Sequence, residues 1–371
     1  MNAPLHPIPP TLRLGYLPLI DCAPLIVAAR LGLDLRYGLR LDLQRQASWA
    51  AVRDKLLSGE LDAAHALAGL VYGVECGIGG PQAELAILLT LNQNGQAIVL
   101  APTLAAALTQ GTPLPAAFAA LGRVPVFAQT FPTGTHAMWL YAWLAAQGVD
   151  PLRDIRAVTL PPAHMPDALA RGELDGYCAG EPWAAQAESV GVGRRIIRSG
   201  ELWPGHPEKV LACRRAFAAL QPELAIALTA TVLDACRWLD DAAHRREAVA
   251  WLADPSVIDL PAERIAACLL PGGLADHGAD PHGLRFHAGG LTNFPWLSDG
   301  RWFLQQFRRC GWLPGSGPGS EQDAAHDADL VARVHRLQTY RAAAALVGVE
   351  VPRCDERVYG LLDRHAQRLS D

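Results

Sequence analysis

Positive charge is scarce in this 371-residue chain, and lysine is almost absent. Its 32 basic residues are outnumbered by 37 acidic ones, and only Lys55 and Lys209 are lysines. A net charge of −5 without a basic cluster argues against direct binding to nucleic acid. A composition of 50% hydrophobic and 19% charged residues is that of an ordinary globular protein with one large domain or two lobes.

The sequence also lacks the signs of a disulfide framework, a metal site and a membrane span. Its eight cysteines are scattered and form no C-x-x-C pair, which favours reduced thiols in a reducing compartment. No uninterrupted apolar run reaches the roughly 18 residues of a membrane helix. The basic start and apolar stretch of a signal peptide are missing before the strand-like residues 12–19. We therefore expect a cytoplasmic protein without a metal or cofactor.

Short apolar runs alternate with helical patterns along the first 200 residues or so of the chain. Four strand-like runs lie within residues 12–91, and the alternation restarts at residue 124. Such alternation predicts an α/β fold, with parallel sheets that are covered by helices.

Two segments of this pattern resemble each other. Residues 56–65 read LLSGELDAAH and residues 169–178 read LARGELDGYC, and each lies between a helix and a strand. Chance similarity is the alternative, because glycine often ends a helix. We favour two similar α/β lobes with a ligand cleft between them.

The lobes are predicted to be discontinuous in sequence. We expect lobe 1 to comprise residues 1–100 and 211–371, including the C-terminal helices, and lobe 2 to comprise residues 101–210. The hinge crossings are then expected near residues 98–102 and 210–213.

The stretch QTFPTGTHAM at residues 129–138 runs directly into an apolar helical pattern. Helix starts expose unpaired N–H groups and a partial positive charge, so they attract anions. Plain capping of the helix by Thr133 or Thr135 explains much of the same motif. An anion contact through His136 and the neighbouring backbone is the functional alternative.

Four polar residues stand at predicted strand ends or helix starts, where ligands of open α/β sheets bind. They are Trp49, Gln96, His136 and Lys209. The ordinary alternatives are core packing for Trp49, a hairpin turn for Gln96, an exposed ring for His136 and neutralisation of Lys209 by Glu208. The scarcity of lysine favours a functional Lys209, because this chain uses arginine where it needs only positive charge.

All four side chains can donate hydrogen bonds, and none of them is a carboxylate. A pocket built only from donors suits an anion that carries no proton, such as nitrate or nitrite. A protonated oxyanion such as bicarbonate would also need an acceptor.

A string of motifs resembles the nitrate-binding proteins of ABC transporters. It includes ASWAAVRDKLLSGELDAAHAL, LNQNGQAIVL, TFPTGTHAMWLYAWLA and GELWPGHPEKVLA, and the resemblance covers residues 12–313. It implies a periplasmic-binding-protein-like fold of type II, with the ligand in a central cleft. It also implies that the anion is held by Trp49, Gln96, His136 and Lys209. Secondary contacts are expected from Thr133, Gly134 and Thr135.

A cytoplasmic location would place the chain in a branch that resembles the nitrate/nitrite sensors of assimilation operons (NasS-like). In that branch the ligand-free sensor holds an RNA-binding antiterminator of the ANTAR class (NasT-like), and ligand binding releases it. The resemblance thus implies a sensor without enzymatic activity. One alternative is the substrate-binding component of a nitrate/nitrite or bicarbonate ABC transporter. Another is an enzyme that uses Cys22 in the cleft, although no base partner for this thiol is apparent.

Overall fold

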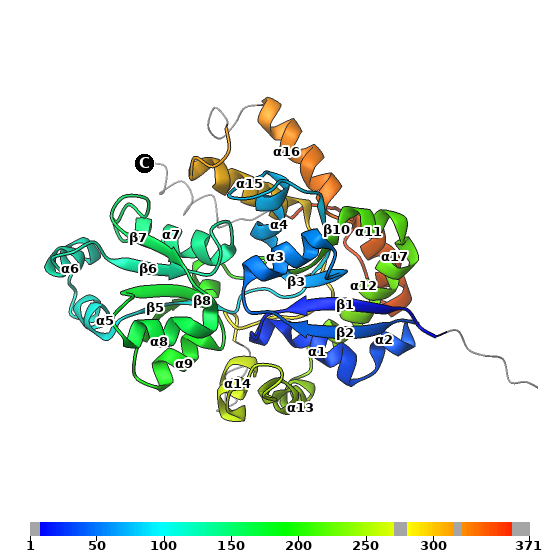
Figure 1. Ribbon diagram of the computed structural model, residues 1–371, viewed down its shortest axis with the longest axis horizontal. Helices are drawn as coiled ribbons and strands as arrows, with labels where there is room; N and C mark the ends of the chain where they lie inside the picture. The colour runs from blue at the N-terminus through cyan, green and yellow to red at the C-terminus, as the bar shows by residue number, and fades with distance from the viewer. Residues whose placement is uncertain (1–7, 271–279, 315–320, 358–371) are drawn as a thin grey trace, which may run out of the picture.

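The computed structural model describes residues 8–270, 280–314 and 321–357. Two five-stranded sheets with flanking helices form two lobes that lie side by side (Figure 1). The α/β fold with two lobes is thereby confirmed.

The first lobe is built on a sheet with the strand order β2-β1-β3-β10-β4. Its strands are β1 (Thr11–Tyr16), β2 (Arg40–Arg45), β3 (Ala63–Leu67), β4 (Leu85–Thr90) and β10 (Lys209–Arg214). The second sheet has the equivalent order β7-β6-β8-β5-β9. Its strands are β5 (Gln96–Leu100), β6 (Val126–Gln129), β7 (Arg156–Thr159), β8 (Gly176–Gly180) and β9 (Arg194–Arg198).

Both sheets are mixed, whereas the sequence pattern predicted parallel ones. β10 runs antiparallel to β3 and β4, and β5 runs antiparallel to β8 and β9. In each sheet the antiparallel strand is the one that enters from the other lobe. The alternation of strands and helices cannot reveal this exchange, because a buried strand has the same apolar composition in either sheet.

The exchanged strands move the lobe boundaries away from those predicted. Since β5 belongs to the second sheet and β10 to the first, the crossings are residues 91–95 and 199–208. The predicted crossings at 98–102 and 210–213 lie within or at the end of these strands instead. The Asn94-Gly95 pair does form a turn, with φ values of 62° and 92°, but it leads to the other lobe rather than around a hairpin.

The two crossings are hydrogen-bonded to each other. The backbone N–H of Leu91 donates to the carbonyl oxygen of Lys209 at 2.7 Å, and that of Gly205 donates to Asn94 Oδ1 at 2.9 Å. The backbone N–H of Lys209 donates to Asn92 Oδ1 at 3.2 Å. This pairing fixes Lys209 at the point where the chain returns to the first lobe.

Helices cover both sheets. Those of the N-terminal half are α1 (Ala23–Arg30), α2 (Leu33–Arg36), α3 (Trp49–Ser58), α4 (Ala68–Glu75), α5 (Pro102–Thr109), α6 (Leu114–Ala120), α7 (Thr135–Ala146), α8 (Met165–Ala170) and α9 (Trp183–Ser189). The short helices are η1 (Ile20–Cys22), η2 (Pro162–His164) and α10 (Ser199–Leu202). Those after β10 are α11 (Arg215–Leu220), α12 (Pro222–Trp238), α13 (Ala242–Ala253), α14 (Ala262–Leu269), α15 (Leu297–Arg309), α16 (Glu321–Val334) and α17 (Leu337–Val347).

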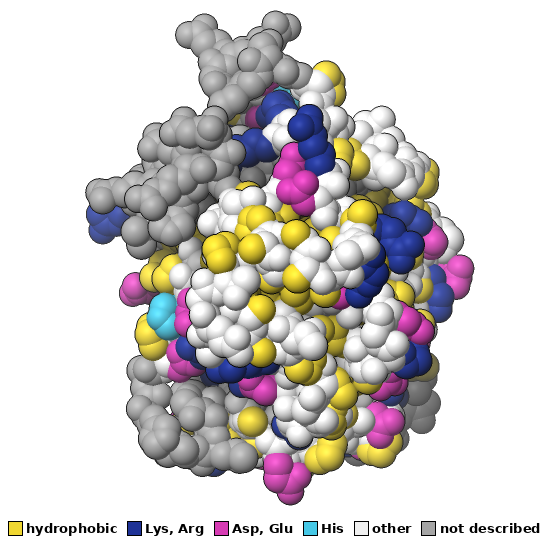
Figure 2. Space-filling view, turned by 90° about the vertical axis from the view of Figure 1, so that its left-hand side faces the viewer, with side chains coloured by type: hydrophobic (Ala, Val, Ile, Leu, Met, Phe, Trp, Pro, Cys, Tyr) yellow, Lys and Arg dark blue, Asp and Glu magenta, His cyan; other side chains and the backbone are white. Residues whose placement is uncertain are grey.

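The outer end of the second lobe carries few charges. Helices α5 and α6 lie there, and residues 101–122 contain no charged side chain. Figure 2, which faces this end, shows hydrophobic and uncharged atoms across its middle and charged side chains mainly around them.

Among the described helices, none combines the length and the apolar composition that a membrane span requires.

The repeated GELD segments occupy equivalent places in the two lobes. Asp62 precedes β3 and accepts a hydrogen bond from the backbone of Arg13 at 2.9 Å, while pairing with its guanidinium. Asp175 precedes β8, accepts from the backbone of Val126 at 2.7 Å and pairs with Arg123. Each aspartate therefore ties its strand to the neighbouring parallel strand, which explains why both copies carry it.

The lobes are in close contact beside the crossings. An added Cβ at Gly69 would lie 1.9 Å from the carbonyl oxygen of Thr133, and one at Gly73 would lie 2.5 Å from Thr133 Oγ1. A second contact between the lobes joins Trp183 of the second lobe to Pro18 of the first, where Trp183 Nε1 donates to the carbonyl oxygen of Pro18 at 2.9 Å. The structure is thus that of closed lobes, and glycine on α4 permits this approach.

A buried histidine joins the C-terminal helices to the first lobe. His335 Nε2 lies 2.8 Å from the Tyr72 hydroxyl and its Nδ1 lies 2.9 Å from the carbonyl oxygen of Pro295. Burial lowers the pKa of His335 to about 4. The folded protein therefore holds this ring neutral at a pH where an unfolded chain would protonate it.

We expect this histidine to make the protein acid-sensitive. As pH falls from about 6.5 to about 4, the unfolded chain gains a proton that folded His335 does not, so stability falls. Replacing His335 with glutamine should reduce this loss by roughly 3 kcal/mol, the equivalent of the pKa difference. Urea unfolding at neutral and acidic pH measures it. His326→Gln, on an exposed part of α16, is the control. Equal acid sensitivity of both variants would contradict the assignment.

Candidate functional site

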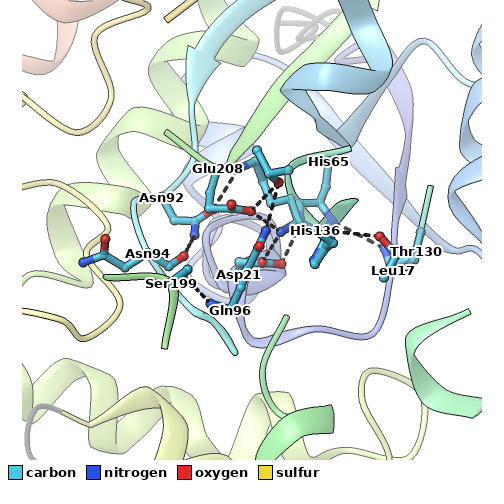
Figure 3. A network of polar contacts seen from close by, with 12 residues as sticks. Leu17, Asp21, His65, Asn92, Asn94, Gln96, Thr130, His136, Ser199 and Glu208 are labelled. Atoms are coloured by element: carbon cyan, nitrogen blue, oxygen red, sulfur yellow. Dashed lines mark hydrogen bonds and ion pairs between the residues drawn. The ribbon is translucent and has the colours of Figure 1, made fainter. Parts of the chain in front are cut away.

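A completely buried ion-pair cluster lies where the two lobes meet. Lys209, the first residue of β10, is 0% exposed. Its Nζ lies 2.8 Å from Asp21 Oδ2 and 2.7 Å from Glu208 Oε2. Asp21 comes from η1, just after β1, and Glu208 is the last residue of the second crossing (Figure 3). One lysine is therefore shared by two buried carboxylates.

The three groups shift one another's ionisation. Burial alone would lower the pKa of Lys209, but Asp21 and Glu208 raise it above its ordinary value. Burial would raise the pKa of Asp21, yet Lys209 and His65 hold it well below the ordinary range. Burial raises the pKa of Glu208, and Lys209 offsets only part of that effect. Asp21 and Lys209 are thus firmly charged, whereas Glu208 is the more readily protonated carboxyl.

The first lobe extends the cluster through a histidine and a tryptophan. His65 Nε2 lies 2.8 Å from Asp21 Oδ1, and its Nδ1 lies 3.4 Å from the backbone N–H of Leu17. These partners place the proton of the neutral ring on Nε2. The Trp49 ring packs against His65 with centroids 5.2 Å apart, and Lys209 Nζ lies 5.9 Å from the Trp49 ring.

The second lobe extends the cluster through a chain of hydrogen bonds. Gln96 Nε2, on the first residue of β5, donates to Thr135 Oγ1 at 2.9 Å. The Thr135 hydroxyl in turn donates to Glu208 Oε2 at 3.2 Å. Trp139 Nε1 lies 3.4 Å from Glu208 Oε1. Glu208 therefore connects α7 of the second lobe to Lys209 of the first.

His136 lies beside this chain on the first turn of α7. Its Nδ1 is 2.7 Å from Thr130 Oγ1. Burial, with Lys209 nearby, lowers the pKa of His136 well below its ordinary value, so the ring is neutral. An added Cβ at Gly180 would lie 3.6 Å from both His136 Nε2 and Asp21 Oδ2. Only glycine at position 180 leaves this space between His136 and the ion pair open.

Two buried nitrogen atoms at this site have no hydrogen-bond partner among the described residues. They are Trp49 Nε1 in the first lobe and His136 Nε2 in the second; a third, His206 Nε2, lies in the second crossing. Buried polar atoms in folded proteins almost always have partners, so each such atom requires an explanation. Lys209 offers one more hydrogen-bond donor to a ligand, because its ammonium has three N–H groups and two carboxylates occupy two of them. The arrangement can hold a small hydrogen-bond acceptor between the lobes.

The structure thus brings Trp49, Gln96, His136 and Lys209 to one place, although their role as ligand contacts stays a prediction. The ordinary alternative for Lys209, neutralisation by Glu208, also holds. The predicted pocket made only of donors is wrong, since Asp21 and Glu208 place two carboxylates in it. Trp49 follows Ser48, whose hydroxyl accepts from the backbone of Ala51 at 3.1 Å, as expected for an N-cap.

The capping alternative for residues 129–138 is wrong, whereas the secondary anion contacts of Thr133, Gly134 and Thr135 stay a prediction. The N-cap of α7 is Gly134, and neither Thr133 nor Thr135 caps the helix. The Thr133 hydroxyl is buried without a partner among the described residues and packs against Gly73. Thr135 has a larger part than expected, because it relays the hydrogen bond from Gln96 to Glu208.

Sequence reasoning missed Asp21 and His65 and treated Glu208 only as a neighbour of Lys209. A signal was nevertheless present. Asp21 interrupts an apolar segment just after β1, and His65 stands in the middle of the buried strand β3. A charged or titratable residue inside an apolar run is buried at a cost, so it needs a partner elsewhere in the fold.

The remaining candidate, Cys22, lies next to Asp21 but has the wrong chemistry for a nucleophile. Its side chain is fully buried, and burial raises the pKa of the thiol well above its ordinary value. The thiolate is the reactive form, so this environment suppresses its reactivity. The described residues contain no group of three or more His, Cys, Asp or Glu side chains that could hold a metal ion.

Two exchanged-strand α/β lobes with a polar site buried between them define the class of two-lobed solute-binding proteins. Comparison with known proteins gives the family. Residues 6–253 match the NMT1-like family, and this chain belongs to it. It is 33% identical over 357 residues to the nitrate/nitrite binding protein NrtA of Synechocystis, which covers 92% of this chain and 77% of that protein.

The solved structure of a relative has the same fold along the whole chain. The periplasmic nitrate-binding protein NrtA from Synechocystis superposes with a TM-score of 0.87 at 30% identity, covering 100% of this chain and 99% of that one. The predicted periplasmic-binding-protein-like fold is therefore confirmed. The bicarbonate transport ATP-binding protein CmpC of Synechococcus elongatus is 34% identical over 345 residues, and the match spans only 50% of its length.

We expect removal of the shared lysine to destabilise the protein strongly. Lys209→Met would leave two buried carboxylates without their cation, and breaking a buried ion pair costs about 3–5 kcal/mol. Lys55→Met, at the only other lysine of the chain, removes the same charge from α3 and should cost far less. Urea unfolding at neutral pH compares them. Equal stability of the two variants would show that Lys209 is not held as an ion pair.

Proposed function

We propose that this chain binds nitrate or nitrite between its lobes. The observation that carries the proposal is the pair of unpartnered nitrogen atoms, Trp49 Nε1 and His136 Nε2, beside the ammonium of Lys209. The family supports it, since the nitrate/nitrite binding protein NrtA is 33% identical along most of the chain. A small planar anion would give these three nitrogen atoms a common acceptor.

The chemistry of the two orphan atoms favours an acceptor without a proton. The indole Nε1 can only donate, so the ligand atom opposite it must accept. His136 Nε2 donates when the Thr130 hydroxyl donates to Nδ1, which the 2.7 Å contact allows. The two carboxylates could accept from a bicarbonate hydroxyl, but each of their oxygens already has a donor: Lys209 and His65 at Asp21, and Lys209, Thr135 and Trp139 at Glu208. Nitrate and nitrite therefore suit the site better than bicarbonate.

Calorimetric titration with nitrate, nitrite and bicarbonate tests the proposal. Trp49→Phe should weaken nitrate binding at least about tenfold, because one hydrogen bond to a charged group is worth about 1.5–3 kcal/mol. It should change stability much less, since Nε1 has no partner in the described structure to lose. Trp251→Phe, in the ring stack on α13, is the matched control.

A further variant, Lys209→Glu, tests the role of the shared cation, because it replaces this cation with a third carboxylate. Nitrate binding should be lost in this variant, with its fold checked by circular dichroism. Undiminished nitrate binding by Trp49→Phe would remove that residue from the site. Tight binding of bicarbonate with no response to nitrate or nitrite would contradict the ligand assignment.

We further propose that the chain is a cytoplasmic sensor that controls an ANTAR-class antiterminator (NasT-like) and is not an enzyme. Its site lies between two lobes, so a bound anion favours closed over open lobes by its differential affinity. A partner that prefers open lobes would then be released. The free state of all eight cysteines supports a reducing compartment. The buried, protonated Cys22 supports a binding role rather than catalysis.

The alternative is the substrate-binding component of a nitrate/nitrite or bicarbonate ABC transporter. It is favoured by the solved relative, which is a periplasmic nitrate-binding protein. Closure around the anion would serve both roles equally, because a transporter also distinguishes closed from open lobes. The two proposals differ only in the partner that contacts the protein.

A pull-down with a purified ANTAR-class antiterminator from the same genome distinguishes them. We expect the ligand-free chain to hold the antiterminator and nitrate to release it. Gly73→Ala should retain the partner even with nitrate, because its added Cβ clashes with Thr133 and keeps the lobes apart. Thr133→Gly in the same chain should restore release by removing the opposing side chain. Partner binding that is absent, or insensitive to nitrate, would favour the transporter role.

A further inference from the structure

The charges at the proposed anion site do not balance when an anion enters alone. Among the described residues, Lys209 is the one lysine or arginine that pairs with Asp21 and Glu208. The two carboxylates, when ionised, already exceed it by one negative charge. An incoming anion would add a second negative charge in a place where Lys209 and Glu208 are 0% exposed. Uncompensated charge in a protein interior is strongly unfavourable.

Five titratable groups of this cluster could take up a proton to restore the balance. Burial lowers the pKa of His65 and of His206, which makes both poor acceptors. Asp21 is a poor acceptor, because Lys209 and the Nε2–H of His65 both stabilise its charged form. His136 faces Lys209 as well, and a second cation there would be repelled. Glu208 is held by one cation and by two neutral donors, the hydroxyl of Thr135 and the indole of Trp139.

The geometry points to Glu208 as a proton-binding site that loads together with the anion. A proton from solvent would convert its carboxylate to a neutral carboxyl as the anion enters. Before the anion and the proton bind, Lys209 faces the charges of Asp21 and Glu208. After they bind, it faces the charges of Asp21 and the anion. The total buried charge is the same in both states. The Lys209 N–H group that contacts Glu208 can then donate to the anion instead.

The surroundings of Glu208 can accommodate the added proton. Its Oε1 lies 3.4 Å from His206 Nδ1 in the same crossing. Burial lowers the pKa of His206 to about 3, so this ring is neutral, and its Nδ1–H donates to the carbonyl oxygen of Pro207 at 3.1 Å. Its contact with Glu208 therefore adds no second cation beside the carboxyl. Arg357 is the next cation, near enough to His206 to lower the pKa of that ring further. Besides Lys209 and His206, the titratable groups that interact with Glu208 are Asp21 on η1 and the thiol of Cys178 on β8. Neither of them is a cation that would hold Glu208 ionised.

This inference rests on the proposed anion binding and gives it a definite pH dependence. An anion next to Glu208 raises the pKa of its carboxyl further, so binding takes up a proton. Affinity should then be constant below the pKa of ligand-free Glu208 and fall up to about tenfold per pH unit above it. The opposite dependence, tighter binding at higher pH, is incompatible with this site.

Calorimetric titration with nitrate in buffers of different ionisation enthalpy measures the protons taken up directly. As the pH rises above the pKa of ligand-free Glu208, we expect uptake to rise towards one proton per nitrate. Glu208→Gln, which resembles the protonated carboxyl, should bind nitrate with no uptake and with a constant affinity. Glu201→Gln, at an exposed glutamate of the same crossing, should keep the uptake of the original chain.

Difference infrared spectroscopy gives a measurement that needs no variant to fold. Nitrate addition at alkaline pH should produce the carbonyl stretch of a newly protonated carboxyl group. Nitrate binding without proton uptake at any pH, or uptake that persists in Glu208→Gln, would overturn this inference alone. Absence of nitrate and nitrite binding at every pH would overturn the proposed function itself, and the inference with it.

Discussion

The shared lysine is the constraint on which the meeting of the two lobes depends. Lys209 holds Asp21 from the start of the first lobe and Glu208 from the returning crossing, and Glu208 in turn contacts Thr135 of the second lobe. Each carboxylate requires the cation because neither reaches water. The first lobe, the crossing and α7 are therefore positioned by one set of charge-assisted bonds, and a ligand placed there acts on all three.

The exchanged strands explain why the site forms at this point. Gln96 is the first residue of β5 and Lys209 is the first residue of β10. These strands hold equivalent antiparallel positions in the two sheets, and each begins where the chain enters a lobe. The pairing of the two crossings thus brings one polar residue from each exchanged strand to the same place. A hinge movement about these crossings would separate Trp49 of the first lobe from His136 of the second, which couples occupancy of the site to closure.

Much of this architecture is local and could be predicted from the sequence. The periodic apolar runs predicted the alternation of strands and helices before β10, apart from α5 and α6, and the repeated GELD segments indicated two equivalent lobes. The exchange of β5 and β10 could not be predicted, because a buried strand does not record which sheet it joins. The residues of the site at strand and helix starts were found for the same local reason. The carboxylates were missed because their pairing with Lys209 depends on contacts between distant segments.

The two carboxylates at the site change how its selectivity among anions must be understood. A pocket of donors alone would attract any small anion, and it would keep its net positive charge when empty. The observed cluster instead contains Asp21 and Glu208, whose charges exceed that of Lys209 by one, so an anion enters a site that is already negatively charged. Such a site favours an anion that also satisfies Trp49 Nε1 and His136 Nε2, which no internal carboxylate reaches. Selectivity then comes from the Trp49 indole, which can only donate, and from His136 Nε2 in the tautomer whose Nδ1 accepts from Thr130. The third N–H group of Lys209 adds the attraction of a cation.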